Sequence, residues 1–465
     1  MSHQDLSLAV NGVKGVCLGR ALKWLLGCVN WKIKFRDDCT WTPSLLAAAA
    51  MLWAWGEQPS VKDRFSIARK ITSYLFGLQW ELAQSYQAFI KLLSRWTSDL
   101  IPPLQDAMRH RMQYNLPDCW GLHGFVLYAV DGSRIDLPRT ASNQHAYSAN
   151  RKKKGKKGKK GNEKAEKSSH SRMADSPQMW LTTLWHISTG LPWNWRTGPS
   201  DCSERSHFME MLSSLPLQAL ITADAGFVGY EYWKQVIESG RHFVIRVGSN
   251  VNLLRHLGCA RQSGQTVYLW PDKAARKNQP PLVLRLIVIH NGKHPVYLVT
   301  NVCSKDRLSD SQIMDIYRSR WGVELFYRSF KQTFNRRKLQ SLSPDNAWLE
   351  LEWSLAGLWA MALYTLIEAR RVGTPTKKVS TAQMLRAFRE VMREYRHPYE
   401  RQAGLCQQLH TAVIDSYVRK NKASRNYPRK KKEKPAGSPI INEATPQQVK
   451  LAKEVLAMYK KGLTA

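Results

Sequence analysis

Two short apolar runs that each end in an aspartate constrain the fold of this chain more than any other feature. Phe125–Val130 precedes Asp131, and Ala219–Ala223 precedes Asp224. Both runs are too short for typical helices and are followed by turn-forming residues, so they predict buried β-strands. In an α/β sheet, functional side chains gather at the carboxyl ends of the strands. The two aspartates are therefore candidates for a site, with local turn capping as the alternative explanation.

The order of elements around these runs predicts an α/β fold. From Gly124 to Lys331 the pattern indicates a strand, a hairpin, a helix, a strand, a helix, a strand, a β-rich insertion and a helix. The hairpin turns at Thr189-Gly190. We expect three parts: a helical N-terminal domain at 1–118, a catalytic domain at 119–372 that contains the insertion at 248–302, and a helical C-terminal region at 373–465.

The N-terminal region shows clear helix signals. Thr42-Pro43 begins one helix and Ser60 caps a second, while a third is expected to end before Pro102-Pro103. Basic residues among the apolar ones suit a DNA-binding module. Amphipathic helices with solvated basic faces give the same pattern, so both interpretations stay open.

The net charge indicates a polyanionic partner. Lys and Arg number 70 against 36 Asp and Glu, a formal charge of +34, and a basic loop is expected at 150–172. Cationic side chains that neutralise phosphates favour nucleic acid, although charge for solubility is the alternative. The eight cysteines form no C-x-x-C pair, which fits a reducing cytoplasm. The apolar run Leu45–Trp55 is too short to span a bilayer.

One predicted helix carries an unusual polar face. Tyr317, Arg320, Glu324 and Lys331 follow one another at spacings of three, four and seven residues, which share one side of a helix. A carboxylate flanked by a phenol and two cations suits a metal ion and its surrounding phosphates. The alternative is a salt-bridge ladder in which Glu324 pairs with Arg320 and Arg328.

Three acids from separate segments form a candidate metal site. Asp131, Asp224 and Glu324 offer oxygen ligands without His or Cys, which favours two Mg²⁺ or Mn²⁺ ions. Two such ions stabilise the attacking and leaving oxygens of a phosphoryl displacement. Other nearby acids are rivals for this role: Asp136, Asp201, Glu350 and Glu352.

The helix face identifies a family. The spacing Tyr317-x2-Arg320-x3-Glu324-x6-Lys331 resembles the Tyr-Arg-Glu-Lys signature of bacterial insertion-sequence DDE transposases of the family-four type. The similarity covers roughly residues 120 to 370. The resemblance implies a ribonuclease-H-like mixed sheet core with a β-rich insertion before the last acid, flanked by the helical N-terminal domain and the C-terminal helices.

The resemblance also implies roles for single residues. Asp131, in VDGS, and Asp224, in ADAGF, look like the first and second acids of the family, and Glu324 like the third. Together they would hold the two metal ions.

The other signature residues would contact DNA. Tyr317, Arg320 and Lys331 are expected at phosphates near the scissile bond, where Arg suits bidentate contacts and Lys acts as a point charge.

One aromatic residue is expected to stack on a base flipped out of the transposon end. Tyr297, in VYLVTN, is the candidate, with Trp270 as its rival and core packing as the alternative for either ring. Trp321 is expected to pack within the protein.

The resemblance implies a DNA transposase that cuts transposon ends and joins them to target DNA by cut and paste, through a hairpin intermediate. Its expected partners are the terminal inverted repeats, the target DNA and a second copy in the DNA complex, with no membrane, in the bacterial cytoplasm at the nucleoid. The main alternative is a non-catalytic DNA-binding regulator or inhibitor derived from a transposase. A nuclease of the same fold and a basic RNA-binding factor are further alternatives.

Overall fold

The computed structural model describes residues 16–78, 82–148, 176–260, 263–291, 294–394, 404–414 and 437–460, so the predicted basic loop lies outside the described residues. The chain divides into two units that are described separately. The first comprises Met1–Leu116, Ile135–Met179 and Arg328–Asp415, and the second comprises Pro117–Arg134, Trp180–Tyr327 and Ser416–Ala465. The helical N-terminal region therefore shares a unit with helices that come after residue 328.

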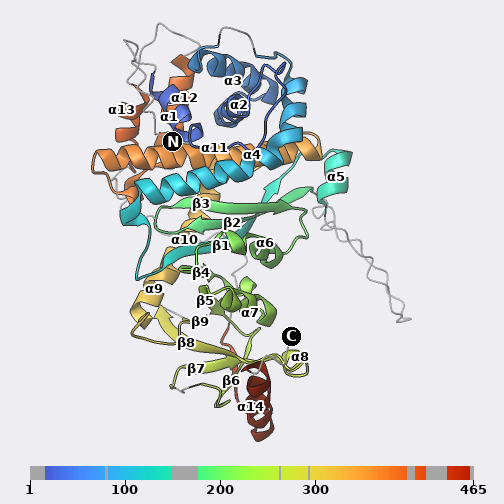
Figure 1. Ribbon diagram of the computed structural model, residues 1–465, viewed down its shortest axis with the longest axis vertical. Coiled ribbons are helices and arrows are strands. Elements are labelled where there is room, and N and C mark those ends of the chain that lie inside the picture. The colour runs from blue at the N-terminus through green and yellow to red at the C-terminus, as the bar shows by residue number, and fades with distance from the viewer. Residues whose placement is uncertain are drawn as a thin grey trace, which may run out of the picture. The chain divides into compact units, whose positions relative to one another are not determined.

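A mixed sheet of ten strands dominates the second unit and confirms the predicted α/β class (Figure 1). In spatial order the strands run β10-β6-β7-β8-β9-β5-β4-β1-β2-β3. Their bounds are β1 Val126–Asp136, β2 Gln178–His186, β3 Leu191–Gly198, β4 Ala219–Ala223, β5 His242–Val247, β6 Asn252–Arg255, β7 Thr266–Leu269, β8 Leu282–Asn291, β9 His294–Thr300 and β10 Ile440–Glu443.

Strand direction changes across the sheet. β1, β4 and β5 are parallel, whereas β2 and β3 form the predicted hairpin, with Gly190 at φ 69° in its turn. β9 pairs antiparallel with β5 and connects the predicted insertion to the same sheet. β10 adds in parallel to the outer edge of β6, so a late segment of the chain covers a strand edge that would otherwise be open.

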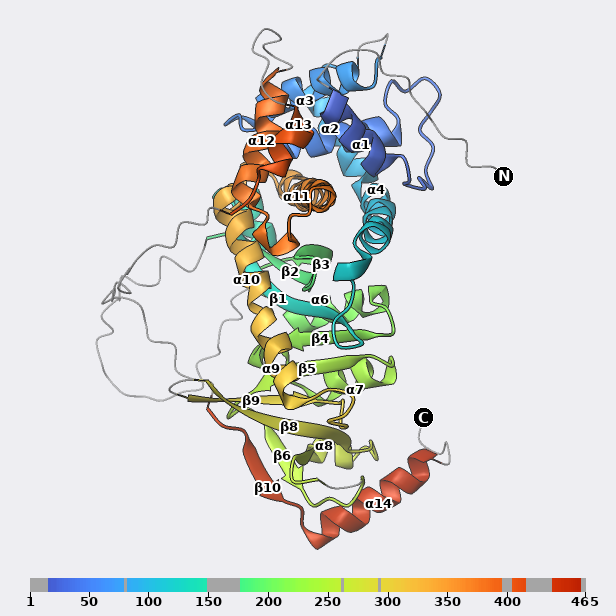
Figure 2. The same cartoon turned by 90° about the vertical axis from the view of Figure 1, so that its left-hand side faces the viewer.

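Helices cover both faces of the strands that form the middle of the sheet. On one face, Ile313 and Ile316 of α9 join an apolar cluster with Val244 of β5. On the other face, Trp233 of α7 packs on Phe243, with ring centroids 5.2 Å apart. The helices of this unit are α6 Glu204–Met211, α7 Tyr230–Glu238, α8 Asp272–Ala275, α9 Asp310–Ser319, α10 Trp321–Arg328 and α14 Pro446–Lys460. In Figure 2, α9 and α10 run past β5, β4 and β1.

The first unit is built from helices. They are α1 Val16–Leu26, α2 Pro43–Trp55, α3 Val61–Leu75, α4 Tyr86–Asn115, α5 Ala141–Tyr147, α11 Pro344–Arg371, α12 Thr381–Glu394 and α13 Leu405–His410. The predicted caps Thr42 and Ser60 both accept backbone N–H bonds. Apolar α2 and α11 are buried along almost their full length. Within the described ranges, none of the helices is both long and apolar enough to cross a membrane.

The third predicted helix ends later than the sequence indicated. α4 continues through Pro102 and Pro103 to Asn115. A proline inside a helix removes a hydrogen bond and normally bends or ends it. Here Leu100 and Leu104, which flank the prolines, are fully buried, so apolar packing holds the helix together across the gap.

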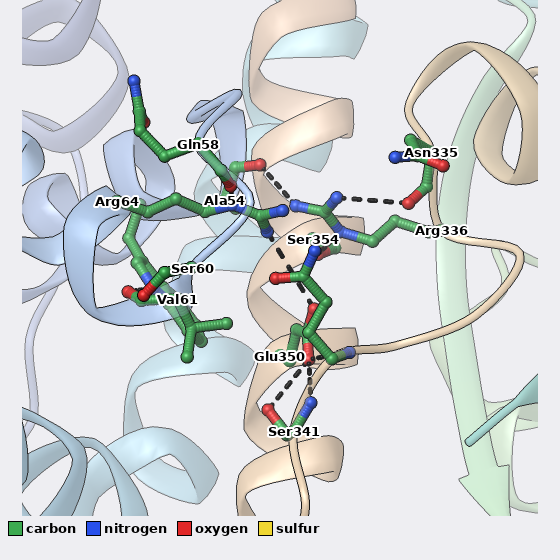
Figure 3. Close-up of polar contacts among 12 residues, drawn as sticks. Ala54, Gln58, Ser60, Val61, Arg64, Asn335, Arg336, Ser341, Glu350 and Ser354 are labelled. Atoms are coloured by element: carbon green, nitrogen blue, oxygen red, sulfur yellow. Dashed lines mark hydrogen bonds and ion pairs between the residues drawn. The ribbon is translucent and has the colours of Figure 1, made fainter. Parts of the chain in front are cut away.

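A buried carboxylate connects parts of the first unit that are far apart in sequence (Figure 3). Glu350 of α11 accepts three hydrogen bonds at Oε2, from the backbone N–H groups of Gln340 and Ser341 and from the Ser341 hydroxyl, at 2.8 to 3.0 Å. Its other oxygen lies 4.0 Å from Nη1 of Arg64. Glu350 therefore has a structural role that its sequence position did not reveal.

A second buried cation, Arg336, belongs to the same cluster (Figure 3). It donates to the Ser354 hydroxyl at 2.8 Å and to the carbonyls of Ala54 at 2.7 Å and Phe334 at 3.2 Å. Burial, reinforced by the charge of Arg64, lowers the pKa of Arg336 to about 9. The residue still carries its charge at neutral pH.

Candidate active site

Asp131 and Asp224 lie at equivalent positions of the paired strands β1 and β4. The parallel register runs from Val126 opposite Ala219 to Ala129 opposite Thr222. Asp131 and Asp224 each come two residues after Ala129 and Thr222, so the same register sets them side by side. Since β4 ends at Ala223, both carboxylates project where the paired strands separate.

The strand that carries Asp131 differs from the prediction, because β1 continues to Asp136 instead of ending at the aspartate. The extension is held at its end, where Asp136 makes backbone hydrogen bonds with Arg337 and Leu339. Gly132 therefore continues the strand and does not begin a turn. Asp131 consequently lies within the strand, not at its C-terminal end as predicted.

Both aspartates also make local hydrogen bonds. Asp131 Oδ1 accepts the N–H of Gly132 at 2.9 Å, and Asp224 Oδ1 accepts the N–H of Gly226 at 2.8 Å. Asp224 thereby caps the short helical turn Ala225–Phe227. The capping role that was the alternative explanation is thus present, and it occupies one oxygen of each carboxylate.

Glu324 extends from α10 and is held by an ion pair. Its Oε1 accepts a hydrogen bond from Nη2 of Arg320 at 2.8 Å, and the Arg320 side chain is only 12% exposed. The predicted four-residue spacing therefore produces a real contact. One turn further on, the hydroxyl of Tyr327 donates to the carbonyl of Asp131 at 2.7 Å, which ties α10 to the strand that bears the first acid.

A close contact also fixes α10. The Cα of Gly322 faces the indole of Trp185, and a Cβ at this position would overlap the ring, lying 2.9 Å from Cζ2. Trp185 itself is buried in β2. Only glycine allows α10 to approach the sheet this closely.

The charges at the site are unbalanced. Burial raises the pKa of Asp131 to about 6, and the negative charges of Asp224 and Glu324 act in the same direction. The N–H of Gly132 and the guanidinium of Arg320 oppose this rise. Because such repulsion acts over short range, the three predicted acids lie within electrostatic reach of one another.

A fourth carboxylate, which the sequence analysis did not identify, faces the same place. Glu204 lies in the first turn of α6, and a Cβ built on Gly132 would lie 2.7 Å from its Cδ. Burial, together with the charges of Asp131 and Asp224, raises the pKa of Glu204 to about 7. The glycine directly after the first acid was the only sequence signal for this contact.

The donor set suits a hard divalent cation, because all its ligand atoms are carboxylate oxygens. In the described part of the chain, however, no three Asp, Glu, His or Cys side chains are gathered closely enough to hold a metal ion as they lie. Glu324 is turned toward Arg320. The chemistry of the donors therefore fits a divalent cation, and the rotamer of Glu324 is the one that pairs with Arg320.

The aromatic candidates occupy different environments. Trp270 is buried, and its indole N–H donates to the Gln279 carbonyl at 2.8 Å, so it belongs to the core. Tyr297 is half-buried in β9. Trp321 is 57% exposed, against the expected packing. Its ring lines a hollow of about 160 Å³. The hollow is also lined by Tyr317, by Arg320 and by four apolar or basic side chains from β8, β9 and α9.

Of the remaining signature residues, Tyr317 and Arg320 contact each other, whereas Lys331 lies in a separate turn. Arg320 lies over the ring of Tyr317, with 5.6 Å from guanidinium carbon to ring centroid. Lys331 belongs to the first unit, in the π-helical turn Ser329–Thr333. The wider π turn breaks the helical period that placed Lys331 on the face of Glu324.

The rival acids have other surroundings. Asp136 accepts a hydrogen bond from Gln178 at 2.7 Å, and Glu350 belongs to the buried cluster of the first unit. Asp201 is exposed, and Ser203, not Asp201, precedes α6 as its cap residue.

The family model described as Transposase DDE domain matches residues 123–359, just over half of the chain. The transposase InsG for insertion sequence element IS4 of Escherichia coli (strain K12) is 29% identical over 135 residues. That match spans 28% of this chain and 30% of the relative.

Among solved structures, a piggyBac transposase synaptic complex with hairpin DNA aligns over 90% of this chain and 89% of its own, at 13% identity. Its TM-score of 0.39 is too low to support any conclusion about this chain.

Proposed function

Because the chain belongs to the transposase DDE-domain family, we propose that it is a DNA transposase that cleaves transposon ends and transfers them to target DNA. The observation that carries this proposal is the level placement of Asp131 and Asp224 at the end of the β1–β4 pair, with Glu324 close enough to perturb Asp131. Such an arrangement of acids supports phosphodiester chemistry.

We infer that the inner part of the sheet is a ribonuclease-H-like core. The strand order β3-β2-β1-β4-β5, with a hairpin followed by parallel strands, supports this assignment. The remaining strands would then form the insertion that precedes the third acid. Such a core would gather the three proposed acids at the carboxyl ends of its central strands.

Asp131, Asp224 and Glu324 are the proposed ligands of two Mg²⁺ or Mn²⁺ ions. Bound ions would lower the pKa of the attacking water and offset charge on the phosphate. The chain's own contribution is to hold the carboxylates in place, through β1, the Asp224 cap and the Tyr327 contact. To bind a metal ion, the Glu324 side chain must turn away from Arg320 or use its second carboxylate oxygen as the ligand.

The cations and aromatic residues of the signature are assigned to DNA. Arg320, already oriented by Glu324 and by the ring of Tyr317, is proposed to contact phosphate next to the acids. Lys331 is proposed as a further phosphate contact. Tyr297 remains the proposed base-stacking residue, and the exposed ring of Trp321 provides a second apolar surface in the neighbouring hollow.

The proposed reaction is cut and paste. Hydrolysis at the transposon end frees a 3′-hydroxyl, which attacks the opposite strand to form a hairpin; the hairpin is then opened and the end is joined to target DNA. The two ends of an element would be handled by two copies of the protein, and the partners would be the terminal inverted repeats and the target. The excess of cationic residues supports binding to such polyanions.

Labelled DNA that carries the element end, incubated with purified full-length protein and Mg²⁺, tests this function. Wild type should nick the end, form the hairpin and join it to target DNA. Glu324→Gln should lose cleavage by at least ~100-fold, since even outer-shell changes at metal sites cost 10–100-fold. The matched substitution Glu231→Gln, on the exposed first turn of α7, should leave cleavage unchanged.

Each contrary outcome has a distinct meaning. Equal cleavage by wild type and Glu324→Gln overturns the assignment of the third acid. Binding of DNA without cleavage by wild type indicates the non-catalytic regulator. Cleavage without joining indicates a nuclease.

A further inference from the structure

Glu204 meets the candidate site from an element that the signature does not include. α6 begins at this residue, directly after the β2–β3 hairpin. A Cβ on Gly132 would overlap the Glu204 carboxylate, and a Cβ on Gly226 would lie 3.8 Å from its Oε2. Gly132 follows Asp131, and Gly226 is the residue whose N–H bonds to Asp224. The Glu204 carboxylate thus lies between the backbone segments that hold the two aspartates.

The ordinary explanation for this residue is incomplete. An acidic side chain in the first turn of a helix interacts favourably with the helix dipole. That interaction requires no approach to two other acids, and like charges in proximity are unfavourable. Within the ranges that the structure describes, the Glu204 carboxylate makes no hydrogen bond or ion pair. The charges of Arg134 and Arg205 partly offset the repulsion from the other acids, while Nη1 of Arg205 donates to the carbonyl of Val228 at 2.7 Å.

The absence of a side chain at position 132 is the second part of the argument. Any Cβ there would overlap the Glu204 carboxylate in its present position and require that side chain to move. Gly132 has no positive φ that would by itself require glycine, and it lies within a strand, where glycine is unfavourable. Glycine at position 132 therefore lets the Glu204 carboxylate approach closely, at some cost to the stability of β1.

We propose that Glu204 is a fourth carboxylate of the active site, which binds the divalent cation together with Asp131 and Asp224, directly or through a bound water. This inference rests on the proposed transposase function. A cation bound between these carboxylates would offset the repulsion between them.

Mn²⁺ binding to the purified full-length protein, without DNA, tests the proposal. Electron paramagnetic resonance of free Mn²⁺ measures affinity without reference to activity. Glu204→Gln should weaken binding by about 10-fold or more. It should also raise the melting temperature of the metal-free protein and reduce the increase that Mn²⁺ produces. Glu231→Gln, the same change in the first turn of α7, should alter none of these quantities.

A second variant displaces the Glu204 side chain by steric overlap. Gly132→Ala keeps every charge but displaces the Glu204 carboxylate, so it should weaken Mn²⁺ binding in the same direction as Glu204→Gln. It also keeps the proposal falsifiable if Glu204→Gln does not fold.

The outcomes separate this proposal from the proposed function. If Asp131→Asn abolishes Mn²⁺ binding while Glu204→Gln and Gly132→Ala bind as wild type does, Glu204 is not a ligand and the transposase proposal stands. If wild type binds no Mn²⁺ and cleaves no DNA, both proposals fail.

Discussion

Two groups of charged residues, one in each unit, show opposite designs. In the first unit, Glu350 lies between Arg64 and Arg336, all three at most 4% exposed, and most of their polar atoms have partners. In the second unit, Asp131 lies among other acids, and its pKa is raised by burial and by their repulsion. One group combines charges of opposite sign, whereas the other accumulates charge of a single sign.

The difference distinguishes a structural cluster from a functional one. A buried ion pair joins helices that are distant in the sequence, and its loss leaves an uncompensated charge. A group of partly buried carboxylates makes the fold less stable and is retained where a cation is to be bound. If this distinction holds, substitutions in the two groups should have opposite effects on stability.

The largest effect on stability should come from Glu350→Gln. The substitution leaves Arg64 and Arg336 buried without their counter-charge, so the free energy of unfolding should fall by about 3–5 kcal/mol. Urea titration followed by tryptophan fluorescence measures the change. The control is Glu57→Gln, which breaks a partly exposed pair with Arg393 and should cost less than about 1 kcal/mol. Equal costs for the two variants would remove the structural half of the comparison.

The second substitution should separate activity from stability. Asp131→Asn removes one of the repelling charges, so the metal-free protein should melt at the same or a higher temperature than wild type. Cleavage of labelled transposon-end DNA should fall by at least ~100-fold. A large loss of stability in this variant would contradict the view that the acids oppose folding.

The third substitution probes the packing that holds α10 against the sheet. Gly→Ala inside a helix normally stabilises it by about 1 kcal/mol. Gly322→Ala should instead destabilise the protein by about 1–3 kcal/mol, because the new methyl group overlaps the ring of Trp185. Cleavage should fall too, since Glu324 follows in the same helix. Combination with Trp185→Leu should recover part of both losses, and failure to do so would exclude this contact as the cause.

The smallest effect should be a dependence of stability on pH. Asp131 has a folded-state pKa near 6, above its ordinary value of 3.8, so the folded state binds the proton more tightly than the unfolded state. The metal-free protein should therefore gain stability from this group as pH falls, by about 1 kcal/mol from about pH 7 to about pH 5.5. The difference in melting temperature between wild type and Asp131→Asn isolates this contribution from that of other groups. A difference that does not change with pH would contradict it.

The periodicity of apolar residues, together with composition, was sufficient to predict much of the fold. The hairpin turns at the predicted residues, and α7 and β5 follow β4 in the predicted order, because turn residues mark the boundaries of each element. The sequence could not predict that α4 would pass through Pro102 and Pro103. That outcome depends on tertiary packing, which local propensity does not include.

The site was predicted in part for a similar reason. The contact of Arg320 with Glu324 follows from helical spacing, which sequence shows directly. The position of Lys331 depends on a local π turn, and Glu204 approaches Asp131 only through the folding of the hairpin. Neither is encoded by a spacing within one element. The proximity of four acids therefore had to be read from the structure.

The pairing of β10 with β6 has a consequence for how the protein is made. The two strands lie at Ile440–Glu443 and Asn252–Arg255, so the ribosome produces the second partner long after the first. Until then, the backbone groups along this edge of β6 lack that partner, and open strand edges pair readily with other chains. A polypeptide whose translation stops before β10 would consequently keep this edge open and be prone to aggregation.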